Sequence, residues 1–580
     1  MVVAPPGLDA VLASRGFVAV ERPRGFKPPA ANDVDIWYHG QLHASRGTAS
    51  VYLHLNDLTL VSAPSIYLAE RPSWLQGWRP HLLGTDRYVV ESLCYNDFEQ
   101  YQLLAHDLGA AALRVLDDAT ETLNRISNPA SIVQDSQRDF ARLWPSDFSA
   151  TYIDTLPADA NVLECRTALW KNAAGDQTLL VGRDPSDIAR RLGIPVTEIR
   201  PNWAAMVFPQ EGLGLSMTAL GPPNNLHEVK HWLGAVAPRT HNLWHRAVQR
   251  RTHYERAVQY CFFVTQGQVI GYFADHPPKH RRARSAKQTR EAYVESVYDH
   301  PLSIVRLHAS RIDDQYLVER NLSHGDPDLR GLRVLLIGAG AVGGFLACSL
   351  LKLGAGLPSP SGTPGPLTIC DREILTTANI GRHVLGLTSV GKSKAREVCR
   401  HLSELWPGCD VHPIAEEFVP SAELLHGYDV VVDATGYETY SRFLSKLCRS
   451  SGWLNAGKAV LHLWIEGRGA VVRGLIQRRP ADACYDCLWN YATTTEPRPR
   501  FPAYSDPAWT QHSGDGYATM TPFAISSPMA AAALGIDLLR TRTDLRSPSF
   551  VSRAVDAAGV HAGVNKSPDR ISKCPGCHRS

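Results

Sequence analysis

The 580-residue sequence lacks a strong excess of charge of either sign. Sixty Lys and Arg residues are matched by 57 Asp and Glu residues, which leaves a formal net charge of +3. A chain so balanced does not carry the electrostatic footprint of a nucleic-acid-binding protein or of one held by anionic lipid. We therefore expect no direct nucleic-acid partner and no membrane partner.

Cysteine is scarce as well. Twelve cysteines among 580 residues are about 2% of the chain, far below the density of a disulfide scaffold. Four of them form two close Cys-x-x-Cys pairs, so reduced thiols in a cytoplasmic protein are expected. The N-terminal stretch MVVAPPGLDAVLASRGFVAVERP has neither a basic segment nor a continuous apolar segment, and we expect no signal peptide.

The sequence also lacks an uninterrupted apolar run long enough to cross a membrane. Val334 to Leu351 comes nearest, but the glycines at 338, 340, 343 and 344 interrupt it. A buried strand, a tight turn and a helix explain this segment better than a membrane span does.

What the chain does have is the composition of soluble globular proteins, with 44% hydrophobic and 20% charged residues. Its length predicts about three or four domains. Residues 1–150 show alternating strand patterns around 35–41 and 50–61, then a helical period over 98–126. Short apolar runs fill residues 151–318, and from 319 to 580 strands and helices alternate. The predicted fold class is α/β: an N-terminal α+β domain, an α/β middle domain and a C-terminal Rossmann-like parallel sheet.

A nucleotide-binding turn is predicted at the first strand of the C-terminal region. Residues 333–337 (RVLLI) run directly into GAGAVGG, where Gly338, Gly340 and Gly343 form a Gly-x-Gly-x-x-Gly pattern before a helix. Such glycines let backbone N–H groups approach phosphate at a helix N-terminus. The next strand, 367–370, ends in Asp371, where a partner for ribose hydroxyls is expected. A Gly/Ser/Pro-rich surface loop over 354–366 accounts for the long spacing.

Basic and amide side chains follow Asp371. Asn379, Arg382, Lys392 and Lys394 bring fixed positive charge near the predicted phosphate site. An NAD-binding domain fits the glycine turn equally well, but cations beside a triphosphate favour nucleotidyl transfer.

Two Cys-x-x-Cys pairs lie near the C-terminus. Cys484 and Cys487 form one, and Cys574 and Cys577 form the other. Four thiolates are the tetrahedral ligand set that structural Zn²⁺ prefers. A redox dithiol is the alternative.

From about Arg320 to the C-terminus, these motifs resemble the ThiF/MoeB/HesA superfamily of ubiquitin-activating adenylyltransferases. The resemblance implies that the glycine turn and Asp371 hold ATP and that Asn379, Arg382 and Lys394 steady its phosphates. It also implies that Asp433, in the strand-end sequence DAT, holds Mg²⁺, although Gly436 stands where the family usually has a second acid.

The same resemblance gives Arg320, just before the first strand, the role of reaching the nucleotide of a partner subunit, and hence implies a homodimer. A surface arginine in a linker is the alternative.

Cys94 is the candidate carrier cysteine of the N-terminal domain. Strand-like and Pro-rich sequence precedes it, Pro80-His81 lies upstream, and an amphipathic helix follows. This order resembles a ubiquitin-conjugating domain of the divergent prokaryotic type, in which a cysteine carries a ubiquitin-like protein as a thioester. The His-Pro-Asn motif of the eukaryotic domain is absent, and Asn96 is a candidate substitute. A buried core cysteine is the alternative.

No cysteine lies between Cys487 and Cys574, where a full activating enzyme carries its own acceptor thiol. Either the adenylate passes directly to Cys94, or a hydroxyl such as Ser513 forms an ester intermediate.

The resemblance therefore predicts a bacterial fused activating and conjugating enzyme of the CBASS antiphage type. Its partners would be a ubiquitin-like protein and a protein target. The alternatives are sulfur-carrier activation, a non-catalytic scaffold with a vestigial nucleotide fold, and an NAD oxidoreductase.

Overall fold

The computed structural model describes most of the chain, which divides into two compact units. Unit 1 comprises residues 1–188 and 196–311, and unit 2 comprises residues 189–195 and 312–580. The described residues are 7–24, 26, 34–58, 63–77, 79–85, 88–95, 107–138, 144, 150–154, 161–172, 174–195, 202–214, 222–251, 258–265, 268–275, 302–323, 325–491, 497–503, 513–514, 519–520, 522–556 and 563–577.

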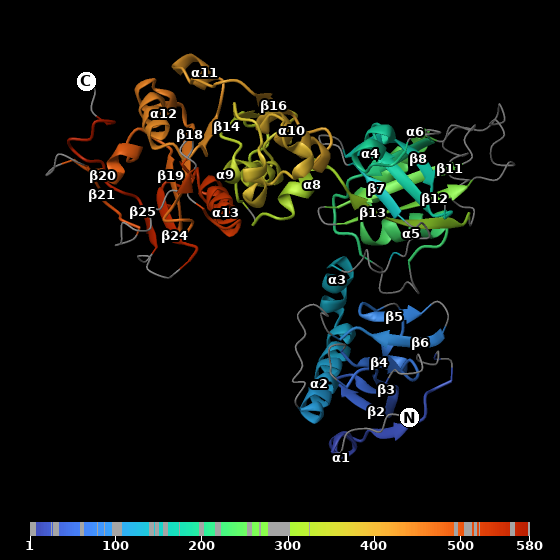
Figure 1. The fold of residues 1–580 in the computed structure, drawn as a ribbon. Helices are drawn as coiled ribbons and strands as arrows, with labels where there is room; N and C mark the ends of the chain where they lie inside the picture. The colour runs from blue at the N-terminus through green and yellow to red at the C-terminus, as the bar shows by residue number, and fades with distance from the viewer. Residues whose placement is uncertain are drawn as a thin grey trace, which may run out of the picture. The chain divides into compact units, whose positions relative to one another are not determined.

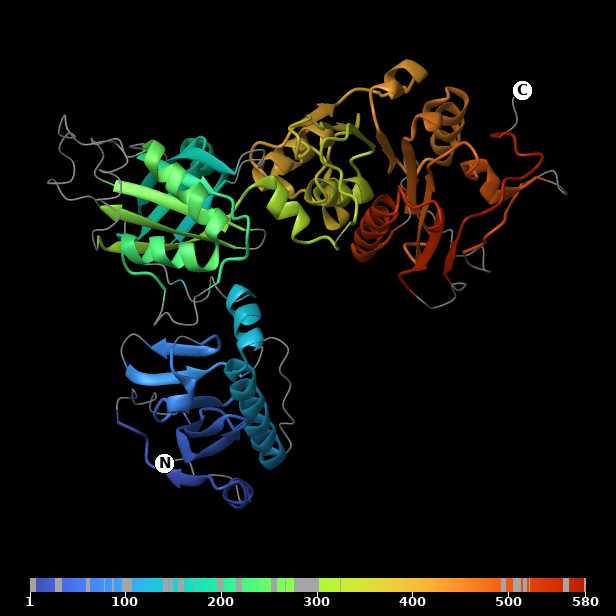
Figure 2. The ribbon, with the colours of Figure 1, turned by 180° about the vertical axis from the view of Figure 1, so that it is seen from behind.

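The N-terminal part of unit 1 is an antiparallel sheet with the strand order β1-β2-β3-β4-β6-β5. Helix α2 lies along one face of this sheet (Figures 1 and 2). The strands are β1 (Val18–Val20), β2 (Ile36–Ala44), β3 (Gly47–Leu55), β4 (Ser65–Leu68), β5 (Leu82–Thr85) and β6 (Tyr88–Leu93), and the helices are α1 (Leu8–Ala13), α2 (Leu108–Ser127) and α3 (Pro129–Arg138).

Helix α2 forms because its sequence is amphipathic and its first turn is capped. The side chain of Asp107 accepts a hydrogen bond from the Ala110 N–H at 2.9 Å, which satisfies a donor at the helix start. One helical stripe packs on the sheet: Ala112, Val115, Leu116, Ala119, Leu123 and Ile126. The predicted strands correspond to β2 and β3, although β3 ends at Leu55 and residues 59–61 of the prediction lie outside the described residues. The predicted helix is confirmed from Leu108 onward; residues 98–106 also lie outside the described residues.

The second part of unit 1 is a closed barrel with the strand order β10-β11-β12-β13-β7-β9-β8. Alternation along β10 separates its two sides, because Ala204 and Met206 face the barrel core while Ala205 and Val207 pack with residues of helices α5 and α6. The elements are β7 (Ala150–Ile153), β8 (Val162–Lys171), β9 (Gln177–Gly182), α4 (Pro185–Arg191), β10 (Asn202–Val207), α5 (Leu226–Val236), α6 (Pro238–Arg251), β11 (Val258–Val264), β12 (Val269–Asp275) and β13 (Ile304–Arg311). That this middle region derives from a degenerate activating domain stays a prediction.

Unit 2 is built on an eight-stranded sheet with the order β16-β15-β14-β17-β18-β19-β24-β25. The parallel strands are β14 (Val334–Ile337), β15 (Leu367–Cys370), β16 (Val411–Ile414), β17 (Val430–Asp433) and β18 (Ala459–Glu466), and the antiparallel ones are β19 (Val471–Gln477), β24 (Phe550–Ala554) and β25 (Val564–Lys566). The helices are α8 (Asp314–Glu319), α9 (Ala341–Lys352), α10 (Lys394–Leu405), α11 (Ala422–His426), α12 (Glu438–Ser450) and α13 (Ser526–Arg540).

The central strands are buried on both faces, as a parallel sheet requires. In β14, Val334 and Leu336 join the core formed with α9, α10 and α13, while Leu335 and Ile337 join the core formed with α11 and α12. Strand order reverses at β14, which pairs with β15 on one side and with β17 on the other. The crevice at the carboxyl ends of strands around such a reversal is where α/β sheets bind ligands.

The sequence expectations for this sheet are confirmed with small corrections. The first strand begins at Val334, one residue later than predicted, and the second spans Leu367–Cys370. The loop over 354–366 is not wholly on the surface, because its first four residues, 354–357, are buried against the sheet core. Within the part of the chain that the structure describes, no helix has both the length and the apolar character needed to span a membrane.

Candidate functional site: a nucleotide cleft and a four-cysteine cluster

A cleft of about 270 Å³ opens at the carboxyl ends of β14, β15 and β17. Its lining includes Gly338, Gly340, Asp371, Glu373, Thr435, Tyr437 and Tyr440. The structure therefore brings the predicted glycine turn and the predicted ribose acid into one pocket at the strand reversal.

Two glycines of the turn are required by geometry. Gly338 has a φ of +92°, in the left-handed region that favours glycine. A Cβ on Gly343 would lie 1.8 Å from the carbonyl oxygen of Gly338, whereas a Cβ on Gly340 would have no atom within 4 Å. The first and third glycines thus hold the backbone where it can approach a ligand, and the second has no steric requirement.

Asp371 and His383 hold the turn from two directions. The Asp371 carboxylate accepts hydrogen bonds from the N–H of Ala339 at 2.7 Å and of Glu373 at 2.8 Å. His383 Nε2 lies 2.8 Å from the Ala339 carbonyl oxygen, and the Leu385 N–H donates to His383 Nδ1 at 3.1 Å. Burial lowers the pKa of His383, so the neutral ring donates from Nε2. Sequence reasoning missed His383, because an imidazole that supports a turn 44 residues away leaves no local pattern.

Lys394 is buried at the start of α10 and pairs with the Glu373 carboxylate of the cleft. The Ser393 side chain caps that helix by accepting from the Arg396 N–H. Lys394 is not itself among the described residues that line the cleft. It contacts the cleft through Glu373, an acid that sequence reasoning did not single out, and its role toward phosphate stays a prediction.

Asn379 and Arg382 are not among the described residues that line the cleft. The side-chain Oδ1 of Asn379 accepts from the Thr376 N–H and hydroxyl, each at 3.0 Å, and so caps the short helix 377–382. The Arg382 guanidinium donates to the Ala378 carbonyl at 3.2 Å and lies 5.4 Å from the centre of the Phe523 ring. Their roles toward phosphate stay predictions.

Asp433 ends β17 and is 1% exposed. Its carboxylate is bonded to the Ser441 hydroxyl at 2.6 Å, His462 Nδ1 at 2.9 Å, the Thr435 hydroxyl at 2.7 Å and the Thr435 N–H at 3.1 Å. Burial opposes ionisation, but these hydrogen bonds prevail and lower the pKa of Asp433. A carboxylate so fully engaged by the protein does not fit the predicted role of a Mg²⁺ ligand.

The four predicted zinc ligands lie together. The sulfurs of Cys484, Cys487, Cys574 and Cys577 all lie within 4.8 Å of one another, and the closest pairs are 3.4–3.7 Å apart. Four sulfurs at about 2.3 Å from one Zn²⁺ would be separated by roughly 3.8 Å. Three of these cysteines are buried, and the set fits a closed structural zinc site.

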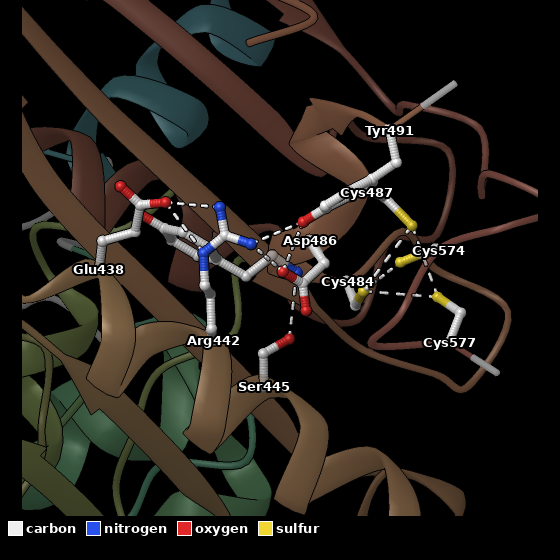
Figure 3. A network of polar contacts seen from close by, with 10 residues as sticks. Glu438, Arg442, Ser445, Cys484, Asp486, Cys487, Tyr491, Cys574 and Cys577 are labelled. Carbon is white, nitrogen blue, oxygen red and sulfur yellow. Dashed lines mark hydrogen bonds and ion pairs between the residues drawn. The ribbon is translucent and has the colours of Figure 1, made fainter. Parts of the chain in front are cut away.

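The cluster is fixed to helix α12 by a polar network (Figure 3). Asp486, which lies between Cys484 and Cys487, accepts hydrogen bonds from Arg442 and, at 2.9 Å, from the Tyr491 hydroxyl. Arg442 also binds Glu438 on the same helix. A Cβ on Gly576 would lie 2.9 Å from the Cys484 sulfur, so the second knuckle needs glycine for close approach.

Cys94 follows strand β6 and is half-buried. Its backbone N–H donates to the His81 carbonyl at 2.8 Å, which places the predicted carrier cysteine beside the Pro80-His81 segment. His81 adopts a φ of +62°, unusual for a residue with a side chain. Its Nε2 lies 3.4 Å from the buried Asp135 carboxylate, which Arg125 also binds. Asn96 lies outside the described residues.

Arg320 and the backbone of Ser513 are two further predicted positions that the structure describes. Arg320 ends α8 and stacks its guanidinium 5.6 Å from the centre of the Tyr316 ring. The backbone of Ser513 belongs to a short strand, β22 (Ser513–Gly514), which pairs with β23 (Thr519–Met520); its side chain lies outside the described residues. The partner-subunit role and the ester role stay predictions.

A glycine turn over a parallel sheet, an acid on the next strand and a four-cysteine cluster are the features that the resemblance to ThiF-type adenylation domains predicts. Residues 313–560 match the ThiF family. Over 98% of its length the chain is 26% identical to the ATP-dependent ubiquitin transferase-like protein Cap2 of Pseudomonas aeruginosa, all of which is covered. It is also 30% identical over 28% of its length to the adenylyltransferase and sulfurtransferase UBA4 of Eremothecium gossypii, of which 34% is covered.

Among solved structures, Escherichia coli MccB with MccA-N7isoASN matches 43% of this chain and 68% of its own, with 17% identity and a TM-score of 0.31. The resemblance inferred from the motifs, a ThiF-type domain in a fusion protein, is confirmed by the family match and by the relative that spans the whole chain.

Proposed function

We propose that the chain is a bacterial ATP-dependent adenylyltransferase fused to a conjugating domain, which activates the C-terminus of a ubiquitin-like protein and passes it to an amine. The observation that carries this proposal is the whole-length similarity to an ATP-dependent ubiquitin transferase-like protein, joined to a cleft that holds the glycine turn and Asp371. By the same similarity, the enzyme acts in antiphage defence. The expected reduced state of its cysteines supports action in the cytoplasm.

In the first step, a carboxylate oxygen of the ubiquitin-like C-terminus attacks the α-phosphorus of ATP, and pyrophosphate leaves. The N–H groups of the glycine turn bind phosphate oxygens, and Asp371 accepts from ribose hydroxyls. Each Asp371 oxygen already accepts one backbone N–H and keeps a second lone pair for this purpose. Lys394 and Arg382 neutralise charge that develops on the phosphates, and Asn379 holds the segment that carries Arg382.

In the second step, the Cys94 thiolate attacks the acyl carbon of the adenylate, and AMP leaves. An amine of the target then attacks the thioester and releases the thiol. The backbone hydrogen bond from the Cys94 N–H to the His81 carbonyl supports this proposal, because it places Cys94 beside the Pro80-His81 segment that the resemblance to a conjugating domain singles out. This two-step reaction needs no intermediate on Ser513. The ester on Ser513 stays a prediction.

Two metals belong to the proposal in different ways. Structural Zn²⁺ fits the four cysteines and would hold the C-terminal segment onto the domain. ATP arrives with Mg²⁺, but the residues predicted to hold that ion do not fit, so no step is assigned to it. A homodimer in which Arg320 reaches the partner's nucleotide completes the proposal.

A Lys394→Ala variant tests the adenylation step. ATP binding is measured by calorimetry, and pyrophosphate release is measured after adding extract of the source cells. We expect release to fall at least about 100-fold, because preorganised charge at a reacting phosphate is worth several kcal/mol. Lys352→Ala, an exposed lysine of α9, is the matched control. Full pyrophosphate release by Lys394→Ala would remove Lys394 from the reaction.

Sulfur-carrier activation is a second candidate, favoured by the absence of cysteine between Cys487 and Cys574 and by the partial similarity to an adenylyltransferase and sulfurtransferase. In that case Cys94→Ala would leave every ATP-dependent product unchanged.

A further inference from the structure

A buried chain of hydrogen bonds connects the cleft to the cysteine cluster. It begins at Thr435, which lines the cleft and donates its hydroxyl to Asp433 at 2.7 Å. Asp433 faces Nδ1 of His462 at 2.9 Å, and Nε2 of that ring lies 3.3 Å from the Gln477 amide nitrogen. Asp433, His462 and Gln477 are each at most 1% exposed, so water does not compete for these bonds.

This series of hydrogen bonds ends beside Cys484, the first of the four cysteines. The Gln477 amide donates to the Ser445 hydroxyl at 2.8 Å, and the same hydroxyl accepts from the Tyr485 N–H at 3.1 Å. Tyr485 directly follows Cys484 and begins the short helix 485–488 between the first two ligands. A shift of the Cys484–Cys487 loop would therefore move the hydrogen-bond partner of Ser445, which lies in the middle of α12.

A second, outer link runs along the same helix. Arg442 binds Asp486 at the cluster and Glu438 in the first turn of α12, as Figure 3 shows. The residue before that turn, Tyr437, lines the cleft, and its N–H donates to the Thr435 hydroxyl at 3.2 Å. Both links thus end at the Thr435 to Tyr437 edge of the cleft.

We propose that Ser445, Gln477 and His462 are positioning residues through which the metal-loaded cysteine cluster fixes the Thr435 to Tyr437 edge of the nucleotide cleft. The ThiF-type zinc site then does more than hold the C-terminal segment, because loss of the metal loosens the cleft. Since binding linkage is reciprocal, ATP in the cleft also raises the affinity of the cysteine cluster for the metal. The inference rests on the proposed function in one respect, that the cleft binds ATP.

The test compares ATP affinity in Zn²⁺-loaded and Zn²⁺-depleted full-length protein, for the wild type and for Ser445→Ala. Depletion should weaken ATP binding by the wild type at least about 5-fold, the lower end of ordinary site-to-site coupling. In Ser445→Ala, the loaded form should already bind weakly, and depletion should change the affinity less than about 2-fold. Ser450→Ala, an exposed serine of the same helix, should behave as the wild type does.

The effect of ATP on metal binding is a second measurement. A serine that only stabilised the fold would not change this effect. ATP should raise the affinity of the wild type for Zn²⁺, measured by competition with a chelator at equilibrium, by the same factor. In Ser445→Ala, ATP should change that affinity less than about 2-fold. Gln477→Met interrupts the same series of hydrogen bonds at a second position, in case Ser445→Ala does not fold.

The inference would be overturned if Zn²⁺ depletion changed the ATP affinity of the wild type and of both variants by the same factor. It would also be overturned if the ATP affinity of the wild type did not depend on Zn²⁺. If the loaded wild type does not bind ATP at all, the proposed function fails instead. Amide exchange then decides the inference separately. Zn²⁺ depletion must reduce the protection of the Thr435 and Tyr437 N–H groups, which donate to Asp433 and to the Thr435 hydroxyl, and unchanged protection there would refute the inference.

Discussion

The chain places its sulfur chemistry in two contrasting settings. In unit 2, four thiols from segments 90 residues apart converge. Hydrogen bonds from Arg442 to Asp486 and from the Tyr485 N–H to the Ser445 hydroxyl tie their loop to helix α12. In unit 1, Cys94 stands half-buried after the last residue of a strand, beside a histidine with a left-handed backbone. The cluster has the ligand set of a structural metal site, whereas the half-buried position of Cys94 is compatible with the carrier role proposed for it.

The difference also explains why one site was easier to infer than the other. Two matched Cys-x-x-Cys pairs specify a ligand number, a geometry and a metal. A lone cysteine specifies none of these, so the role of Cys94 rests on what surrounds it and on its fusion to a ThiF-type domain.

Replacing a cluster cysteine should have the largest effect on stability. Cys484→Ser should lose bound Zn²⁺ and lower the unfolding free energy of unit 2 by at least about 3 kcal/mol, because metal binding at a structural site is folding free energy. Metal analysis and denaturant titration measure both quantities. Cys409→Ser, a half-buried cysteine outside the cluster, should keep its zinc; equal losses in the two variants would contradict a metal site.

The glycine turn should show the next largest effect. Gly343→Ala places a methyl group against the Gly338 carbonyl and should destabilise unit 2 by about 3 kcal/mol, the upper range for overpacking, while abolishing ATP binding. Gly340→Ala meets no atom within 4 Å and should stay within about 1 kcal/mol of the wild type. Thermal unfolding and ATP calorimetry would show the contrast, and similar behaviour of the two variants would refute the steric account.

A smaller, pH-dependent effect is expected at His383. Burial lowers its pKa in the folded protein, while the unfolded chain keeps a value near 6.5. As the pH falls below about 6.5, the unfolded state binds the proton first, so stability is lost. The wild type should therefore lose more unfolding free energy between pH 7 and pH 5 than His383→Gln does. Parallel pH profiles for the two proteins would exclude this contribution.

Cys94→Ala should have the smallest effect on stability, because the thiol is only half-buried. We expect a change below about 1 kcal/mol, since large costs come from deleting fully buried side chains. Iodoacetamide should modify Cys94 in the Zn²⁺-loaded wild type faster than any cluster cysteine. Mass spectrometry of peptides measures the labelling of each cysteine. Faster labelling of the cluster cysteines than of Cys94 would contradict the contrast between a closed cluster and an accessible thiol.

The sequence could predict those parts of the site that depend on local pattern. The turn at Gly338 to Gly343, the acid at Asp371 and the cysteine pairs each follow from residue type and spacing, and the structure brings each set together. The partners of Asp433 could not be predicted in this way, because Ser441 lies on the following helix and His462 on the next strand. The closed barrel was missed for a related reason, since its closure depends on pairings between strands far apart in the chain, such as β13 with β7.

The most direct test of the account is the intact mass of the purified protein after incubation with MgATP and extract of the source cells, compared with that of Cys94→Ala. The account predicts an ATP-dependent adduct with the mass of a small protein, which dithiothreitol removes and Cys94→Ala lacks. An adduct that survives thiol treatment and persists in Cys94→Ala would contradict a carrier thioester on Cys94.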